Sequence, residues 1–343
     1  MKTLPYIFIV AALIIGAGIY LEATKDSSTA ITKQMLESSD SDVDVEFKNY
    51  GKAPEFTGLG TWLNSEPLKL SELRGKVVLV DFWTYSCINC VRTLPYLTHW
   101  DETYRDKGLV IVGIHTPEFG FEAVTKNVET ALKRHNIKYP VAQDNDYMTW
   151  NAFSNRYWPA KYLINQNGDV VYTHFGEGNY DETEAAIQKL LELDPSLEAR
   201  ADAIELPSLS GPRSPEMYFG SSREEHMAQT YTPGVAKRFN WLVGQEMNQY
   251  QLEGTWIIEN EKAILQSENG RIRLRYKGSA VHMVASNAKS STLKIFINNV
   301  EQSPVIVKDS QLYTLFQEDS VTEHELIIEI SGSGLEAFTF TFG

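Results

Sequence analysis

The stretch that decides the fold is residues 77–90, which read VVLVDFWTYSCINC. Its first half, Val77–Trp83, is an almost uninterrupted apolar run, which is typical of a strand covered on both faces. The second half carries Cys87 and Cys90, separated by two residues, at the start of a stretch with helical character that extends to about Tyr104. The strand therefore delivers two cysteines to the edge of a sheet, where a helix begins.

Cys87 and Cys90 are the only cysteines in the 343 residues. A thiolate is the nucleophile in disulfide exchange, and the positive end of a helix dipole favours it. We expect Cys87, at the helix start, to attack a substrate disulfide, and Cys90, one turn later and less exposed, to resolve the mixed disulfide. No cofactor is expected beyond this redox-active disulfide, Cys87–Cys90.

Two other roles are open to the cysteine pair. A zinc ion would need two more ligands, and the seven histidines are scattered, with no pair at short ligand spacing. A purely structural disulfide would close too small a loop to stabilise the chain much. We therefore expect catalysis by the pair and no metal site.

Strands and helices alternate from residue 46 to residue 195. After the cysteines we expect strands at 109–114, 161–164 and 170–173, and helices at about 121–135 and 182–193. This order predicts an α/β layer structure with a mixed sheet. Residues 196–213 then combine prolines, glycine and small polar groups, which predicts a linker.

Short alternating runs replace helices in residues 214–343. Examples are Ile272, Leu274 and Tyr276 between basic residues, and Phe338, Phe340 and Phe342 near the end of the chain. Several strands at this spacing predict an all-β sandwich, jelly-roll-like in type.

The first 21 residues predict a membrane anchor. No residue from Leu4 to Leu21 is charged. As a helix, this segment is also just long enough to cross a bilayer. Lys2 precedes it and acidic residues follow, which by the positive-inside rule places the rest of the chain on the extracytoplasmic face of the cytoplasmic membrane. A cleaved signal peptide, giving a secreted form, is the alternative. Residues 22–45, rich in Ser, Thr, Asp and Glu, predict a flexible tether.

The charge of the chain argues against nucleic acid as a partner. The formal net charge is -14, and no run of basic residues interrupts the acidic composition. Binding a polyanion relies on clustered Lys and Arg that release counterions. We therefore expect protein partners and a membrane, and no nucleic acid.

Three segments carry a resemblance to a known family. Residues 80–95, VDFWTYSCINCVRTLP, resemble the active-site segment of the thioredoxin superfamily, in its TlpA-like branch and most of all in DipZ-type proteins. Residues 158–164, WPAKYLI, match that branch, and residues 214–220, SPEMYFG, resemble the β-rich domain of the same proteins. The resemblance covers residues 46–343. It implies a thioredoxin-like first domain and a thiol-disulfide oxidoreductase that acts on protein substrates, more as a reductase than as an oxidase.

The resemblance also implies roles for residues around the cysteines. Asp81 stands where thioredoxins carry a buried carboxylate, and burial would raise its pKa toward the range useful for deprotonating Cys90. A solvated strand end is the other interpretation of Asp81. By the same resemblance Trp83 lies against the active site and is expected to bind substrate, with plain core packing as the other interpretation. Trp158 precedes a cis proline, Pro159, that by the resemblance faces the cysteines and offers backbone to an extended substrate.

The family also suggests partners. In it, electrons cross the membrane from a CcdA-like donor to reduce exported thiol or disulfide proteins, sometimes for cytochrome c maturation. The sequence departs from the thioredoxin pattern at two places near the cysteines, and both changes alter the redox potential by changing local polarity. Ile88-Asn89 replaces the Gly-Pro common between the cysteines of thioredoxins, and Ser86 replaces the preceding tryptophan.

Two other functions remain open. The first is a thiol peroxidase of the peroxiredoxin type, because Thr84 stands three residues before Cys87, although Val80 occupies a position where those enzymes carry proline. The second is a glycan-binding or adhesion protein that uses the thioredoxin-like part as a scaffold. Its basis is the likeness of the predicted sandwich to carbohydrate-binding modules.

Overall fold

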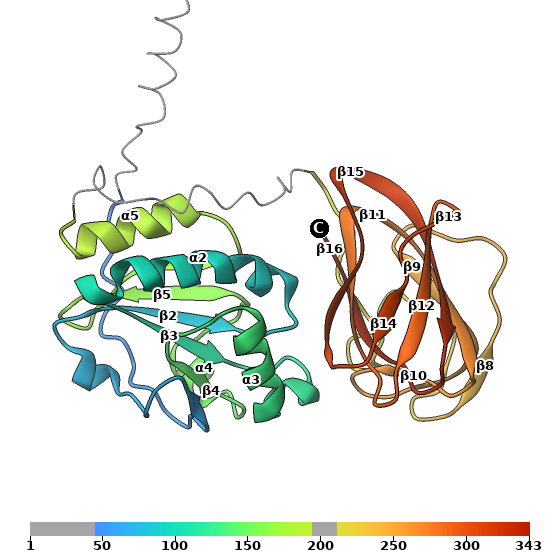
Figure 1. Ribbon diagram of the computed structural model, residues 1–343, viewed down its shortest axis with the longest axis horizontal. Helices are drawn as coiled ribbons and strands as arrows, with labels where there is room; N and C mark the ends of the chain where they lie inside the picture. The colour runs from blue at the N-terminus through green and yellow to red at the C-terminus, as the bar shows by residue number, and fades with distance from the viewer. Residues whose placement is uncertain (1–44, 194–210) are drawn as a thin grey trace, which may run out of the picture. The chain divides into compact units, whose positions relative to one another are not determined.

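A six-stranded mixed sheet forms the first domain (Figure 1). The strands are, in order across the sheet, β1 (Trp62–Leu63), β4 (Val141–Gln143), β3 (Leu109–His115), β2 (Val77–Trp83), β5 (Ala160–Ile164) and β6 (Val170–Phe175). Strands β2, β3 and β4 run parallel, while β1, β5 and β6 pair antiparallel to their neighbours. The α/β class with a mixed sheet is confirmed.

Four helices pack on this sheet. They are α2 (Ile88–Tyr104), α3 (Thr125–Arg134), α4 (Met148–Ala152) and α5 (Tyr180–Leu190), with short 3-10 turns at η1 (Leu70–Leu73), η2 (Arg105–Lys107) and η3 (Gly120–Ala123). Helices α2 and α5 lie side by side, as Figure 1 shows, with the rings of Tyr96 and Tyr180 stacked at 3.6 Å between centroids. Helices α3 and α5 are shorter than the helices expected at 121–135 and 182–193. Strands β1 and β4 and helix α4 were not expected.

Strand β2 is the centre of the domain and sets up the site. All seven of its residues are buried, which confirms a strand covered on both faces. Phe82 points into the apolar core on one face, where its ring meets Trp150 of α4 at 5.7 Å. Because side chains alternate along a strand, Asp81 and Trp83 point to the opposite face. The chain leaves β2 at Trp83 and, after three intervening residues, reaches Cys87, the N-cap residue of α2.

The C-terminal domain is all β. Its strands are β7 (Met217–Tyr218), β8 (Lys237–Phe239), β9 (Gln249–Ile258), β10 (Ala263–Leu265), β11 (Asn269–Ser286), β12 (Ser291–Ile297), β13 (Val300–Glu301), β14 (Val305–Val307), β15 (Gln311–Ser331) and β16 (Glu336–Phe342). The long strands β11 and β15 pair along their length. The first part of β11 also pairs with β9 and the last part with β16, with a register shift between Gly278 and Ala280. The all-β sandwich is confirmed.

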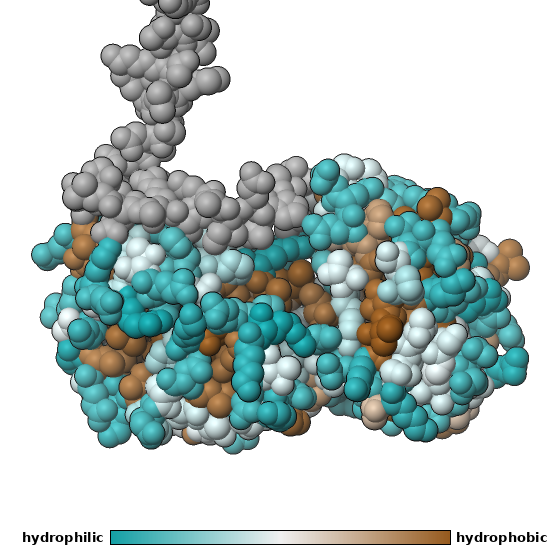
Figure 2. All heavy atoms as spheres, viewed as in Figure 1, coloured by the Kyte–Doolittle hydropathy of each residue, from teal (hydrophilic) through white to brown (hydrophobic). Residues whose placement is uncertain are grey.

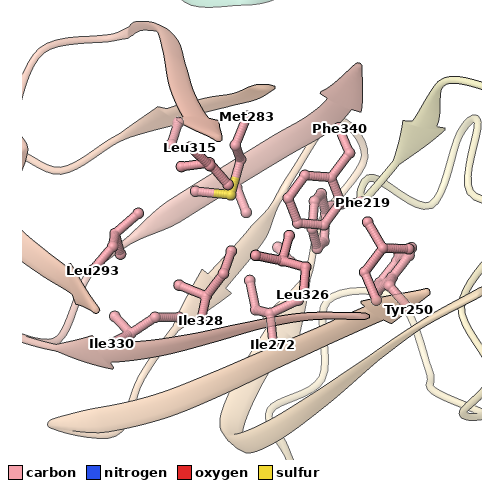
Figure 3. Packing of buried hydrophobic residues seen from close by; sticks show 14 of the residues in the cluster. Phe219, Tyr250, Ile272, Met283, Leu293, Leu315, Leu326, Ile328, Ile330 and Phe340 are labelled. Carbon is pink, nitrogen blue, oxygen red and sulfur yellow. The ribbon is translucent and has the colours of Figure 1, made fainter. Parts of the chain in front are cut away.

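The core of this domain comes from the alternation seen in the sequence. Ile272, Leu274 and Tyr276 are fully buried on β11, while the basic residues between them are at least partly exposed. Figure 3 shows Ile272, Met283, Ile328 and Phe340 pointing into one apolar interior between strands. On the face of the molecule seen in Figure 2, hydrophilic side chains cover most of the described surface and apolar atoms show in patches between them.

Residues Glu46–Gly343 form one compact unit. A small apolar cluster joins its two domains: Phe119 of the first domain packs with Val284 and Phe338 of the second, and Phe121 and Tyr218 pack against them. The rings of Phe121 and Phe338 meet edge to face at 4.7 Å. Each domain also keeps a larger core of its own.

The computed structural model describes residues 45–193 and 211–343. The expected anchor at 1–21, nearly all of the expected tether at 22–45 and most of the expected linker at 196–213 lie outside these residues. Within the described ranges, no helix is long and apolar enough to cross a membrane.

Candidate functional site

The two cysteines differ in exposure. Cys87 is the N-cap residue of α2, with extended backbone angles, and its side chain is partly exposed. Cys90 lies one turn into the helix and is only 1% exposed. Both are free thiols in the structure. An accessible thiol at a helix start followed by a covered one is the arrangement that attack and resolution by a cysteine pair require.

The covered thiol resists ionisation. Burial raises the pKa of Cys90 well above its ordinary value, and the neighbouring Cys87 thiol and the charge of Asp81 raise it further. A thiol in this environment becomes a nucleophile only when a base removes its proton as it reacts. The site therefore needs a proton acceptor close to Cys90.

The charge of Asp81 reaches Cys90, which makes this carboxyl a candidate for that acceptor. It is fully buried, and burial raises its pKa to about 7, against an opposing effect of Lys161. Lys161 is its register partner on β5, is equally buried, and has its own pKa lowered by burial. Neither charged group has a hydrogen-bond partner among the described residues. A buried carboxyl with this pKa can exchange a proton near neutral pH.

Sequence reasoning did not single out Lys161. Its place in the strand Ala160–Ile164, otherwise apolar apart from Tyr162, was a usable signal, because an isolated charge in a central strand needs a partner. Its pairing with Asp81 depends on the register between β2 and β5, which only the structure supplies.

Trp158 and Pro159 lie at the start of β5. The bond between them is cis, as the family resemblance implies. The half-buried Trp158 ring donates through Nε1–H to the carbonyl of Thr116 at 3.1 Å and lies 4.3 Å from the ring of Trp150, measured between centroids. These contacts hold the tryptophan at the surface of the first domain.

Trp83 occupies a different place. It is fully buried, and its ring meets His115 edge to face at 5.2 Å. Gly113 on β3 makes room for it, because a Cβ at that glycine would stand 2.9 Å from the Trp83 Nε1. Trp83 therefore lies inside the domain with no exposed surface, while Trp158 is half-buried.

A cavity of about 570 Å³ opens at Cys87. Its lining includes Cys87, Asn89, Glu118 and Trp158 from the first domain and Ser214, Glu216, Tyr218, Arg223 and Phe342 from the C-terminal domain. Glu118 ties the two sets together: it accepts a hydrogen bond from the Tyr218 hydroxyl at 2.9 Å and forms a 2.6 Å ion pair with Arg223. The C-terminal domain thus supplies part of the surface around the reactive thiol, which sequence reasoning did not foresee.

The described residues do not present a metal site. Within 45–193 and 211–343, no group of three or more His, Cys, Asp or Glu side chains is placed to hold an ion. What the site can do with its own residues is thiol chemistry: one accessible sulfur, one covered sulfur and one buried carboxylate.

Comparisons with known proteins agree with this chemistry. Residues 48–191 match the Redoxin family model, and residues 214–343 match the model of the thioredoxin like C-terminal domain. Protein DipZ of Mycobacterium bovis is 35% identical over 326 residues, which cover 89% of this chain and 45% of DipZ. The chain thus spans about half the length of this curated relative.

Smaller relatives match the first domain alone. The thiol-disulfide oxidoreductase ResA of Bacillus cereus is 31% identical over 148 residues, 43% of this chain and 82% of ResA. The thiol-disulfide oxidoreductase YkuV of Bacillus subtilis is 28% identical over 138 residues, 40% of this chain and 93% of YkuV. With its cysteine pair at the start of α2, the chain belongs to the thioredoxin-like thiol-disulfide oxidoreductases, and it is similar to DipZ over most of its length.

Proposed function

We propose that this enzyme reduces disulfides in exported proteins on the extracytoplasmic side of the cytoplasmic membrane, to which residues 1–21 tether it. The location is supported by the uncharged segment Leu4–Leu21 and the acidic residues that follow it. The direction of electron flow is supported by the resemblance to DipZ-type proteins. A single observation carries the chemistry: Cys87 opens onto a cavity, while Cys90 is buried within electrostatic reach of Asp81.

The first step is attack by Cys87. Its thiolate attacks one sulfur of the substrate disulfide, so that a Cys87–substrate disulfide forms and the other substrate sulfur leaves as a thiolate. Trp158 and the residues of the C-terminal domain that line the cavity hold the substrate segment around the disulfide.

The second step is attack by Cys90. Asp81 takes the proton of the Cys90 thiol, and the resulting thiolate attacks the Cys87 sulfur. The Cys87–Cys90 disulfide forms and the second substrate sulfur leaves as a thiolate. Protonation of both substrate thiolates completes the reduction, with two electrons taken from the enzyme. A membrane dithiol donor of the CcdA-like kind returns these electrons by reducing the Cys87–Cys90 disulfide.

The equilibrium reduction potential tests the direction. We expect the Cys87–Cys90 couple to lie below about -220 mV, in the range of thioredoxin and the glutaredoxins rather than of DsbA at about -120 mV. A value above about -150 mV would make the protein an oxidant of its substrates and contradict the reductase role.

The location needs its own experiment. A reporter that fluoresces only in the cytoplasm, fused after Gly343, should stay dark while full-length protein remains in the membrane fraction. Recovery of a shortened soluble form would favour cleavage over anchoring. A fluorescent fusion would contradict export.

A further inference from the structure

A buried glutamate holds the turn that carries Cys87. Glu122, in η3, is fully buried, and its Oε1 accepts a hydrogen bond from the Ser86 hydroxyl at 2.5 Å and one from the Ser86 backbone N–H at 3.3 Å. Ser86 directly precedes Cys87. The last residue before the nucleophile is therefore anchored at two points to a side chain 36 positions later in the sequence.

The second oxygen of the same carboxylate is equally engaged. Its Oε2 accepts hydrogen bonds from the backbone N–H groups of Glu118 at 2.6 Å and Phe119 at 3.0 Å. The bond from Phe119 belongs to the capping box that starts η3. A capping glutamate needs only this bond, so the contacts to Ser86 are additional. Glu122 thus ties the turn after β2 to the loop after β3.

All four of these hydrogen bonds use Glu122 as an acceptor, which suits the ionised carboxylate. Burial acts in the other direction and raises the pKa of Glu122 to about 7, with a further increase from Glu118. On protonation, one carboxyl oxygen carries a hydrogen and no longer serves equally well as an acceptor. One of the two loops would then be held less firmly.

Among the described residues, no positively charged group is one of the main influences on the pKa of Glu122, although Arg134 acts on the neighbouring Tyr85 and Arg223 on Tyr147. Glu118, on its own loop, is paired with Arg223, and Tyr85 and Tyr147 interact with Glu122 electrostatically from the turn after β2 and from the turn before α4. His115 stacks on Tyr85, and burial lowers its pKa to about 3, so its ring is neutral at physiological pH. Hydrogen bonds, rather than an ion pair, therefore hold the carboxylate.

We propose that Glu122 is a positioning residue for the redox site: its ionised carboxylate holds Ser86, and through it Cys87, in the geometry from which the thiolate attacks. This rests on the proposed function, because it concerns the first step of disulfide exchange. Glu122 does not touch the reacting sulfur atoms. It acts through Ser86, and it makes the rate of attack depend on a second titration besides that of the thiol.

The test isolates the first step. In full-length protein carrying Cys90→Ser, only Cys87 can react, so that Asp81 and the resolving step do not contribute. The rate of reaction with dithiodipyridine, an uncharged disulfide, is measured with and without Glu122→Gln from about pH 5.5 to pH 8.5. The rate of the protein with Glu122 intact is divided by the rate of the Glu122→Gln variant. This ratio removes the dependence on thiolate concentration that the two proteins share.

We expect this ratio to be close to one at the acid end and to rise to about ten at the alkaline end, with a midpoint near pH 7. Ser86→Ala, which keeps the carboxylate but removes its 2.5 Å donor, should show a smaller effect of about threefold over the same range. Glu129→Gln is the matched control, because Glu129 lies on the surface of α3 beside Lys126. It should leave the rate unchanged.

Three results would overturn the inference. A ratio of one at every pH would mean that Glu122 does not position the turn. A constant ratio at every pH would mean a structural role that is independent of its charge. A faster Glu122→Gln variant would mean that the charge only repels the thiolate. If Glu122→Gln failed to fold, an unchanged rate in Ser86→Ala would overturn the inference about Glu122 and would leave the proposed function intact. An unreactive Cys87 in the parent protein would instead refute the proposed function.

Discussion

Asp81 and Lys161 are register partners on β2 and β5, both fully buried and neither hydrogen-bonded to another described residue. Burying two charges costs free energy that their mutual attraction only partly offsets when no hydrogen bonds complete the pair. Burial accordingly raises the pKa of Asp81 and lowers that of Lys161. The role that we propose for Asp81, as proton acceptor for Cys90, would account for a pair that costs the fold free energy.

This cost predicts a pH-dependent gain in stability for Asp81→Asn. The pKa of Asp81 is raised to about 7 on folding, so the folded state binds a proton more tightly than the unfolded state, and wild type loses stability between about pH 4 and pH 7. The variant avoids this loss. Because Asp81→Asn also leaves Lys161 buried without its partner, the prediction concerns the pH dependence: from pH 4 to pH 8 the stability of the variant relative to wild type should rise by about 2 to 4 kcal/mol, measured by urea unfolding. A gain that was the same at pH 4 and pH 8 would contradict the assignment.

The same substitution should slow resolution of the mixed disulfide. The variant lacks the proton acceptor that we propose for Cys90, so decay of a Cys87–substrate disulfide should be about 100-fold slower at pH 7. Attack by Cys87 should be nearly unaffected. Stopped-flow measurement of both steps checks this, and an equal slowing of both would mean that Asp81 acts on the whole site.

Removing Lys161 should shift the pH dependence of the same step. Because Lys161 lowers the pKa of Asp81, Lys161→Met should move the midpoint of the resolution rate to higher pH. A midpoint that stayed in place would show that the two groups are not coupled. Lys126→Met, on an exposed side chain of α3, is the control and should have no effect on the midpoint.

Gly113 is expected to be required for packing around Trp83. A Cβ there would stand 2.9 Å from Trp83 Nε1, 3.1 Å from Val141 and 3.2 Å from Tyr139, all in a filled core. Gly113→Ala should destabilise the protein by about 1 to 3 kcal/mol in urea unfolding. Gly60→Ala, where the nearest atom would be 3.7 Å away, should cost much less. Equal effects would contradict the packing argument.

Phe338 is expected to hold the apolar cluster shared by the two domains. Its buried ring contacts Phe119 and Phe121, so Phe338→Ala should cost about 3 to 5 kcal/mol in global unfolding or in an earlier transition. Val300→Ala, at a side chain that is 62% exposed, is the control. A change of less than about 0.5 kcal/mol at Phe338 would show that the cluster contributes little.

The parts of the fold that follow from local patterns could be predicted. The apolar run Val77–Trp83 and the alternation on β11 were sufficient to predict these strands, because the spacing of the apolar residues indicates which faces of a strand are buried. The cysteine pair was also visible, since its spacing and its place before a helix are local features. Short elements such as β1 and α4 carry too few residues to show a period.

What depends on tertiary contacts could not be predicted. Lys161 meets Asp81 only through the register of β2 and β5, and Glu122 reaches Ser86 only because two loops end at the same edge of the sheet. Tyr218 and Arg223 line the cavity at Cys87 from another domain. No sequence pattern encodes such pairings, because each partner is chosen by the packing of the whole chain.

The most direct test of the account is a trapping experiment on the two cysteines. With a protein disulfide such as insulin as substrate, Cys90→Ser should accumulate a mixed disulfide through Cys87, because the thiol that resolves it is gone. Cys87→Ser should accumulate none and should lose essentially all reductase activity. Accumulation of a mixed disulfide through Cys90 in Cys87→Ser, with none in Cys90→Ser, would reverse the roles and contradict the account.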